Sequence, residues 1–430
     1  MSKLQELINK LCPNGVEFKP LGEVFEMRNG YTPSKNNPDF WEGGTIPWFR
    51  MDDIRENGRI LSDSIQHITP SAIKGKGLFE ANSFILATTA TIGEHALIIA
   101  DSLANQRFTN LKVRKSLSNL LVTKFIYYYM FIVDDFCKRN TNVSGFASVD
   151  MDKLKKMPFP VPPIEVQEEI VRILDSFSDY AAELQAELQA RKQQYEYYRN
   201  LLLTFNPSAY GCGTDDEQKD GVTTWEGHNY KIEWKKMGEI GTFIRGKRFV
   251  RTDIMEQGVP CIHYGDMYTY YGLYTNNTPT FLKEEKAQKM RFAQKNDIVI
   301  VAAGENKDDL GNAVAWLGEK PAAVHDACFI FRSNLYPNYI SHICRSHNYH
   351  KQIKMFANEA KICSVSGQDL QKVLIPVPEY ELQIKIASIL DRFETLVNDL
   401  TNGLPAEIAA VKDQYEYYRN KLLTFKKLSA

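Results

Sequence analysis

Several residue groups in this 430-residue sequence have types and spacings that could support enzymatic chemistry. The run Gly241-Thr-Phe-Ile-Arg-Gly246-Lys247-Arg248 has the glycine and lysine spacing of a phosphate-binding loop. It ends in arginine where serine or threonine would ligate magnesium, and the matching position near Gly30 lacks the lysine. Phosphate-loop chemistry is therefore not indicated.

Two further groups have simpler structural explanations. His342, Cys344, His347 and His350 carry ligand atoms for a metal, but on the helix expected there they spread round more than one face. Glu284-Glu-Lys286 could mimic part of a nuclease motif, but no convincing partner aspartate precedes it. An Asn/Asp-Pro-Pro-Tyr/Phe run of an amino-methyltransferase is also missing from the sequence. We therefore predict neither a catalytic residue nor a metal site.

Two sequence motifs occur twice in the chain. Gln194-Tyr-Glu-Tyr-Tyr-Arg199 returns as Gln414-Tyr-Glu-Tyr-Tyr-Arg419, and Leu174-Asp-x-Phe177 returns as Leu390-Asp-x-Phe393. A Pro-Val-Pro step precedes the second motif in both copies, and the same shift of residue number pairs Gly30 with Gly246. Such self-similarity defines the domains before any local motif does. Each half is a variable block followed by a repeated helical run.

The repeated run has the period of a packed helix. From Val166 to Leu202, apolar residues follow one another at spacings of three and four, and only Arg191 breaks the seam. The second copy, from Leu382 to Leu422, has one extra four-residue step near Ile408. Pro405 falls inside this step, so we expect the second helix to kink or restart there. No stretch of the run is free of charge, which excludes a membrane span.

The repeat divides the chain into five segments. We predict an α+β fold class, with mixed blocks over 1–157 and 230–374. Residues 158–205 are predicted to be a Pro step followed by a long spacer helix, and residues 375–426 the second repeated region with its own long spacer helix. Residues 206–229, rich in glycine and acidic side chains, are the predicted linker. Within the blocks, strands are expected at Ile46–Arg50, Ser83–Ile92 and Ile298–Ala303, and buried helices at Leu120–Lys138 and Tyr339–Phe356.

Composition limits the function classes. The 52 Lys and Arg residues balance 53 Asp and Glu, so a uniformly basic nucleic-acid binder is excluded and any basic surface must be local. The N-terminus lacks signal-peptide and transit patterns, and seven scattered cysteines contain no Cys-x-x-Cys pair. We therefore expect a cytoplasmic protein without a disulfide framework.

Each of the two variable blocks is followed by a Pro-x-Pro step, a Leu-Asp-x-Phe helix start and a Gln-Tyr-Glu-Tyr-Tyr-Arg helix end. In this arrangement the chain resembles the specificity subunit of a type I restriction–modification enzyme. The resemblance covers essentially the whole chain. It implies two target recognition domains, each reading one half of a bipartite double-stranded DNA site, separated by an antiparallel pair of coiled-coil helices related by an internal pseudo-two-fold repeat.

The resemblance also implies partners. Two adenine methyltransferase subunits dock on such a chain, and the full complex adds two subunits that carry the ATP-driven endonuclease and translocase. The specificity subunit itself is then not an enzyme and binds no cofactor. S-adenosylmethionine, ATP and magnesium are expected in the partner subunits.

Candidate DNA contacts follow from side-chain chemistry near strand ends and turns. Arginine, asparagine and glutamine can pair with guanine or adenine edges, and threonine can meet phosphate or the thymine methyl group. In the first block the candidates are Trp48, Arg50, Thr88, Thr89, Asn105, Gln106 and Arg107. In the second block they are Arg245, Lys247, Arg248, Arg251, His263, Tyr264, Lys307 and His325. Solvation of each charged residue and core packing of Trp48 are the structural alternatives.

Four repeated tyrosines are candidate partner contacts. Tyr195, Tyr198, Tyr415 and Tyr418 are identical in the two copies, which indicates docking of one identical partner at each end. Packing on the helical seam is the alternative. A different functional class also remains open, namely a coiled-coil scaffold that bridges partners without reading DNA.

The four-residue repeat Ala182-Glu-Leu-Gln185, Ala186-Glu-Leu-Gln189 suggests a test of spacing. Deleting Ala186–Gln189 removes roughly 6 Å of helix, compared with ~3.4 Å per base pair. We expect the unread gap to change by about one or two base pairs while both half-sites stay the same. Methylation mapping checks this; altered half-sites with the original gap would refute it.

Overall fold

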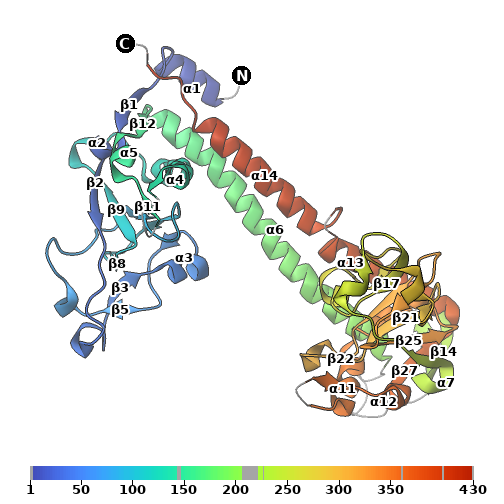
Figure 1. Cartoon of the computed structure of the whole chain (residues 1–430). Helices are drawn as coiled ribbons and strands as arrows, with labels where there is room; N and C mark the ends of the chain where they lie inside the picture. The colour runs from blue at the N-terminus through green and yellow to red at the C-terminus, as the bar shows by residue number, and fades with distance from the viewer. Residues whose placement is uncertain are drawn as a thin grey trace. The chain divides into compact units, whose positions relative to one another are not determined.

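A computed structural model of the chain describes residues 3–142, 147–205, 221–225, 227–359, 362–399 and 401–428. The chain splits into two compact units, Met1–Glu183 with Ile408–Ala430, and Leu184–Glu407. We call these the first and second units. The long helix α6 (Ile164–Thr204, 41 residues) gives its first part to the first unit and its last part to the second (Figure 1).

The first unit is built on a five-stranded sheet of order β2-β9-β6-β7-β4. Its central strand β6 is buried along its whole length, as expected of a short apolar run in the middle of a sheet. The helices are α1 (Lys3–Leu11), α2 (Leu21–Val24), α3 (Met51–Asn57), α4 (Thr123–Arg139) and α5 (Met151–Lys156). The strands are β1 (Glu17–Pro20), β2 (Phe25–Asn29), β3 (Ile46–Phe49), β4 (Ile60–Leu61), β5 (His67–Ile68), β6 (Ser83–Ala87), β7 (His95–Ile98), β8 (Leu103–Ala104), β9 (Phe108–Val113), β10 (Thr141–Asn142), β11 (Ser148–Val149) and β12 (Pro158–Val161).

The second unit repeats this plan with a sheet of order β15-β25-β21-β23-β18. In both sheets one edge strand pairs in parallel, β4 with β7 and β18 with β23. Its helices are α7 (Met237–Ile240), α8 (Asp266–Thr269), α9 (Glu284–Ala287), α10 (Pro337–Ile343), α11 (His347–Phe356), α12 (Gly367–Lys372) and α13 (Tyr380–Asn398). Its strands are β13 (Gly221–Trp225), β14 (His228–Lys236), β15 (Gly241–Arg245), β16 (Ile254–Met255), β17 (Val259–Ile262), β18 (Tyr274–Thr275), β19 (Thr280–Leu282), β20 (Phe292–Ala293), β21 (Ile298–Val301), β22 (Ala303–Gly304), β23 (Ala313–Trp316), β24 (Ala322–Val324), β25 (Cys328–Ser333), β26 (Cys363–Ser364) and β27 (Leu374–Pro378).

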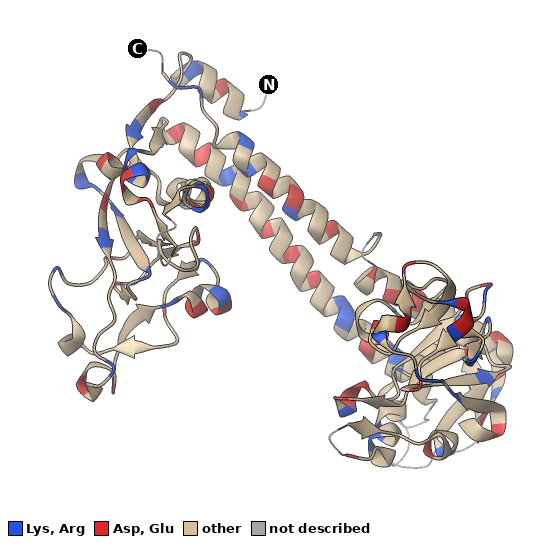
Figure 2. Ribbon diagram, viewed as in Figure 1, with Lys and Arg blue, Asp and Glu red and all other residues tan. Residues whose placement is uncertain are grey.

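The repeated helices pair in an antiparallel register. In the first unit the start of α6 packs on the end of α14 (Leu404–Leu422), where the ring centroids of Phe177 and Tyr418 lie 5.4 Å apart. In the second unit α13, the first segment of the second repeated helix, packs with its C-terminal part on the end of α6, where the ring centroids of Phe393 and Tyr198 lie 5.6 Å apart. The same two motifs thus meet in both units. Figure 2 shows acidic and basic residues interleaved along α6.

A repeated carboxylate anchors each variable block to its helix. Asp175 of α6 accepts hydrogen bonds from Lys124 Nζ at 2.7 Å and Tyr128 Oη at 2.6 Å, both on α4. Asp391 of α13 accepts bonds from Asn338 Nδ2 at 2.9 Å and His342 Nε2 at 2.8 Å, both on α10. His342 is therefore committed to this joint, which favours the structural role over metal binding for that residue.

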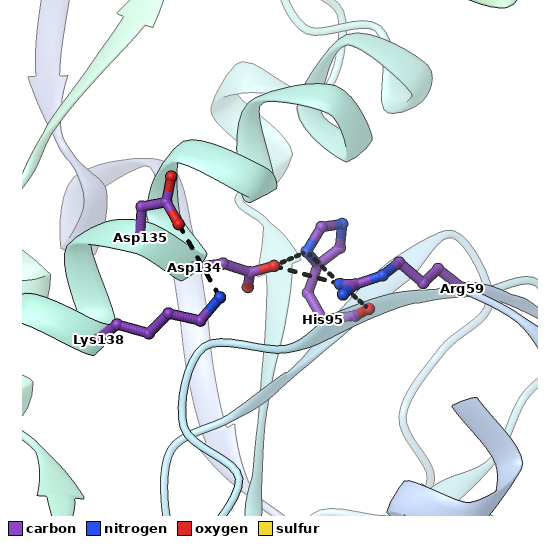
Figure 3. Close-up of polar contacts among 5 residues, drawn as sticks. All are labelled: Arg59, His95, Asp134, Asp135 and Lys138. Atoms are coloured by element: carbon purple, nitrogen blue, oxygen red, sulfur yellow. Dashed lines mark hydrogen bonds and ion pairs between the residues drawn. The ribbon is translucent and has the colours of Figure 1, made fainter. Parts of the chain in front are cut away.

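A buried ionic network ties α4 to the sheet of the first unit (Figure 3). His95 Nδ1 lies 2.7 Å from Asp134 Oδ2, and Arg59 Nη1 lies 3.2 Å from the same oxygen. Arg59 also donates to the backbone oxygen of His95 at 3.2 Å. Burial lowers the pKa of His95, although the hydrogen bond and charge of Asp134 act in the opposite direction. The network joins β7, α4 and the segment before β4.

Most sequence predictions of local structure hold, with differences at element ends. The helix expected over Tyr339–Phe356 is two helices, because Ser346 caps a separate α11 through its hydroxyl and the Tyr349 amide. The strand expected over Ser83–Ile92 ends at Ala87. The second repeated helix does restart, with α13 ending at Asn398 and α14 beginning at Leu404, just before Pro405.

The predicted linker is shorter than expected. Residues 221–225 and 228–229 were assigned to it, but they belong to strands β13 and β14. Strand β14 is held on its other side by β27, so the hairpin completes a three-stranded sheet that the local composition did not reveal. Residues 206–220 and 226 of the predicted linker lie outside the described part of the chain.

We predict that Gln167→Ala destabilises the first unit. The Gln167 side chain is buried and accepts from the Val122 amide at 2.8 Å, while its Nε2 donates to Leu120 O and Pro162 O, each at 2.7 Å. Removing it leaves buried backbone groups without partners, so the free energy of unfolding should fall by about 2–4 kcal/mol. Chemical denaturation measures this. The neighbouring exposed Glu168→Ala is the matched control, and equal losses in both variants would contradict the prediction.

Candidate nucleic-acid interface

A tight backbone crossing places the candidate residues of each unit. Gly30 follows β2 and donates its amide to Phe108 O, and an added Cβ would lie 2.3 Å from Ala104 O. Gly246 follows β15 and donates its amide to Cys328 O, and an added Cβ would lie 2.2 Å from His325 O. Only glycine fits such an approach. The repeated glycines therefore keep the same crossing in two otherwise different blocks.

The crossing brings matching strand ends together. In the first unit β3 runs parallel to β8, and the next residues, Arg50 and Asn105, follow the pair. In the second unit β17 runs parallel to β24, and His263 and His325 follow. The Asn105 amide donates to Phe49 O at 3.0 Å, and the His325 amide donates to Ile262 O at 3.2 Å. Asn105 and His325 thus occupy equivalent positions, as do Arg50 and His263.

In the first unit five predicted contacts remain at least partly accessible. Arg50, Thr89 and Asn105 are half-buried, and Gln106 and Arg107 are exposed. The Arg107 amide donates to Asn105 Oδ1 at 3.0 Å, which fixes the turn. Thr32 Oγ1 bonds to the side-chain oxygen of Gln106. Thr32 was missed by the sequence analysis, although its position two residues after the repeated glycine could have indicated it.

Trp48 and Thr88 are corrections to the predicted interface. Trp48 is 2% exposed, donates Nε1 to Tyr31 O at 3.0 Å and packs edge-on against Trp41. Thr88 is buried, with its hydroxyl 3.0 Å from Thr109 Oγ1. Trp48 lies in the buried half of β3, and Thr88 follows β6 and is also buried. Neither side chain has the accessible surface that a direct contact with DNA needs.

In the second unit an aromatic cluster occupies the crossing. The ring of His325 lies 5.0 Å from His263 and 5.4 Å from Tyr264. Burial lowers the pKa of both histidines, with partial opposition from Asp266 for His263 and from Asp326 for His325. His325 Nε2 lies 3.1 Å from Phe249 O, and its Nδ1 accepts from the Ala327 amide at 3.1 Å. These two backbone contacts favour the neutral imidazole of His325 with its proton on Nε2.

The basic residues near Gly246 form an exposed strip. Arg245, Lys247, Arg248 and Arg251 are all exposed. Within the described part of the chain, none of these four forms an ion pair with a carboxylate. Arg291, which the sequence analysis did not select, donates to Arg245 O at 2.7 Å and extends the strip. Lys307 differs, since it pairs with Glu359.

The repeated tyrosines divide into buried and exposed members. Tyr195 is buried against His342, with 3.2 Å between Tyr195 Oη and His342 Nδ1, and Tyr415 is half-buried against Tyr128. Burial of Tyr195 within its own unit corrects the prediction that it faces a partner, whereas Tyr415 keeps part of its surface accessible and its partner contact stays a prediction. Tyr198 and Tyr418 stay partly exposed, at 36% and 39%.

Sequence analysis missed the most exposed tyrosines of the repeat. Tyr197 is 62% exposed and Tyr417 is 60% exposed. They do not belong to the apolar seam of the repeated helices, so the apolar periodicity did not indicate them. Each packs edge-on against the next tyrosine, at 5.4 Å in the first copy and 5.3 Å in the second. The repeat therefore presents the same exposed aromatic pair on both units.

Comparison with known proteins identifies the family. The family described as "Type I restriction modification DNA specificity domain" matches residues 13–191 and again 230–410. The chain belongs to this family. Its two matched regions correspond to the two repeats, and the membership favours a DNA-specificity role over a scaffold that does not read DNA. It is a type I specificity subunit built from two recognition blocks and repeated helices.

Named relatives agree with the family assignment. The specificity subunit of the type I restriction enzyme EcoprrI from Escherichia coli is 38% identical over 96% of this chain and 94% of its own length. The EcoR124I/EcoR124II specificity subunit, also from Escherichia coli, is 29% identical over 99% of this chain and 98% of its own length.

Solved structures of type I specificity subunits share the fold. The HsdS subunit from Thermoanaerobacter tengcongensis has a TM-score of 0.53 and 15% identity, covering 96% of this chain and 97% of that one. A chain from a structure describing complex assembly and conformational transition of the type I R-M system has a TM-score of 0.61 and 16% identity, covering 96% of this chain and 98% of that one.

Among the described residues, no helix has both the length and the apolarity that crossing a membrane requires.

Proposed function

We propose that each unit reads one half of a bipartite double-stranded DNA site. The observation that supports this proposal is that the two units share one backbone crossing, at Gly30 and Gly246, but place different side chains on it. The backbone at Gly30 and at Gly246 makes the same hydrogen bonds, yet Arg50 and Asn105 of one unit are replaced by His263 and His325 in the other. A common frame with different polar groups suits recognition of two different base sequences.

Local charge supports the same proposal. The whole chain has a formal net charge of −1, so DNA attraction must come from particular surfaces. The strip Arg245, Lys247, Arg248 and Arg251 lies next to the aromatic cluster and has no acidic partner among the described residues. These residues suit contact with phosphates, which position a protein without selecting sequence. The histidine cluster then supplies selection.

The repeated helices would serve spacing and assembly. Helix α6 contributes to both units without a break, so its length would set the gap between half-sites. The exposed residues Glu196, Tyr197 and Tyr198, which return as Glu416, Tyr417 and Tyr418, offer one identical surface on each unit. Exposed aromatics of this kind often anchor protein interfaces. They would dock two methyltransferase subunits.

In the complete assembly this chain supplies recognition, and other subunits supply chemistry. The two methyltransferase subunits would bind S-adenosylmethionine, and two endonuclease and translocase subunits would bind ATP and magnesium. The relative whose structure concerns complex assembly of the type I R-M system supports an assembly of this kind.

Single alanine variants test the half-site assignment. We expect His325→Ala to relax about one base position in one half-site and Asn105→Ala to relax one in the other, since a lost base contact costs about 1–3 kcal/mol of discrimination. Methylation mapping in the assembled complex measures both. Arg248→Ala is the control and should weaken binding to all sequences alike. If His325→Ala and Asn105→Ala affected the same half-site, the proposal would be wrong.

Tyrosine variants test the docking surface. Tyr197→Ala should remove one methyltransferase subunit, and Tyr417→Ala the other, because each deletes an exposed aromatic from one unit only. A typical interface hot spot costs 2 kcal/mol or more, or roughly thirtyfold in affinity. Native mass spectrometry reports the stoichiometry. Gln193→Ala changes an exposed, non-aromatic residue and is the matched control. A wild-type complex with one methyltransferase subunit would contradict the assignment of two docking surfaces.

A further inference from the structure

The repeated arginine of the Gln-Tyr-Glu-Tyr-Tyr-Arg motif has different surroundings in the two units. In the first unit Arg419 lies over the ring of Phe131, with 4.3 Å from the guanidinium carbon to the ring centroid. It also lies 5.4 Å from the Tyr415 ring. An aromatic face suits a guanidinium that is 9% exposed, because the negative face of the ring attracts the cation.

In the second unit the residue equivalent to Phe131 is another arginine. Tyr128 and His342 are equivalent, since each bonds to the repeated aspartate and contacts the repeated tyrosine. Three residues further along the chain come Phe131 on α4 in one unit and Arg345, in the turn after α10, in the other. Arg199, the counterpart of Arg419, keeps its tyrosine contact at 5.2 Å but has no such phenylalanine.

A cavity of about 390 Å³ opens at this place in the second unit. Arg199 and Arg345 both line it, with Glu394 as the one carboxylate in its wall. Tyr195, Tyr268 and Tyr271 add phenol groups. The lining side chains therefore bring two positive charges and one negative charge to a partly enclosed space.

The hydrogen bonds and ion pairs of the described residues leave part of both guanidinium groups unsatisfied. Arg345 donates Nη1 to Asn312 Oδ1 at 3.1 Å, but Nε of Arg345 and Nε of Arg199 are buried without a partner. Nε of Arg419 in the first unit also lacks a partner, but there the Phe131 ring covers the guanidinium. Neither arginine forms an ion pair within the described part of the chain. Burial lowers the pKa of Arg345, Glu394 acts in the opposite direction, and Arg199 lowers it further. Two such cations gain stability from an added anion.

We propose that this cavity of the second unit binds the phosphate group of a small molecule. Guanidinium groups offer planar pairs of N–H donors that match phosphate oxygens. The hydroxyl of Tyr268 can donate a further bond, whereas those of Tyr195 and Tyr271 are engaged by His342 and Thr278. The cavity is larger than inorganic phosphate needs, so free phosphate and a mononucleotide are the two sources to distinguish. The lining of the cavity includes none of the predicted DNA contacts, and the proposal does not depend on how the units read DNA.

Thermal unfolding of the full chain tests the site. Sodium phosphate should raise Tm by a few degrees in a concentration-dependent way, relative to sodium chloride at the same ionic strength, because a ligand that binds only the folded state stabilises it. Adenosine monophosphate is the second probe. A larger shift with this nucleotide than with phosphate identifies the nucleotide as the better source, and equal shifts identify the phosphate group alone.

Variants separate this cavity from the exposed basic strip. Arg345→Phe recreates the arrangement of Arg419 and Phe131, so it should fold and lose the phosphate-dependent shift. Glu394→Gln removes the only carboxylate of the cavity and should tighten phosphate binding several-fold. Arg55→Ala, at an exposed arginine of the first unit that belongs to neither the cavity nor the basic strip, is the matched control and should keep the full shift.

Three outcomes would overturn the proposal. One is a phosphate shift no larger than that of chloride. Another is a phosphate-dependent shift in Tm that survives in Arg345→Phe. If Arg345→Phe does not fold, the equivalent outcome is a phosphate-dependent shift in Tm that Glu394→Gln leaves unchanged. The third is stabilisation by duplex DNA alone with no response to either small probe, which would assign the arginines to the nucleic acid.

Discussion

The structure depends on aromatic stacking between the start of one repeated helix and the end of the other. Phe177 stacks on Tyr418, and Phe393 stacks on Tyr198, with centroid separations of 5.4 and 5.6 Å. Offset stacking of this kind adds to the apolar area that the rings bury. Because each stack takes one ring from each repeat, neither repeat completes a unit by itself.

The same joint accommodates different recognition blocks. Asp175 and Asp391 are repeated, but the first accepts from lysine and tyrosine and the second from asparagine and histidine. A carboxylate accepts several hydrogen bonds of varied chemistry, so the donors can change while the anchor stays. Gln167 and Gln383 act similarly, each bonding a backbone amide and a proline carbonyl. These constant contacts let the blocks diverge without losing their attachment.

The two units place different side chains on the shared backbone crossing. Gly30 and Gly246 hold that crossing, and the residues carried by it share neither charge nor shape between the units. Arg50 and Asn105 offer hydrogen-bonding groups suited to guanine and adenine, whereas His263 and His325 offer imidazole rings whose pKa burial lowers. A protein of nearly zero net charge can therefore still hold one strongly basic strip beside its candidate recognition residues.

The sequence by itself determined the duplication, the apolar seam of the helices, the restart near Pro405 and the main strands, because these depend on local spacing and backbone restriction. Tertiary structure alone decided that Trp48 and Thr88 are core residues, that Tyr195 is buried while Tyr197 is exposed, and that β13 completes a sheet. It also decided that Arg345 takes the place of Phe131. These outcomes depend on contacts between residues distant along the chain, and local composition does not encode which of those residues will meet.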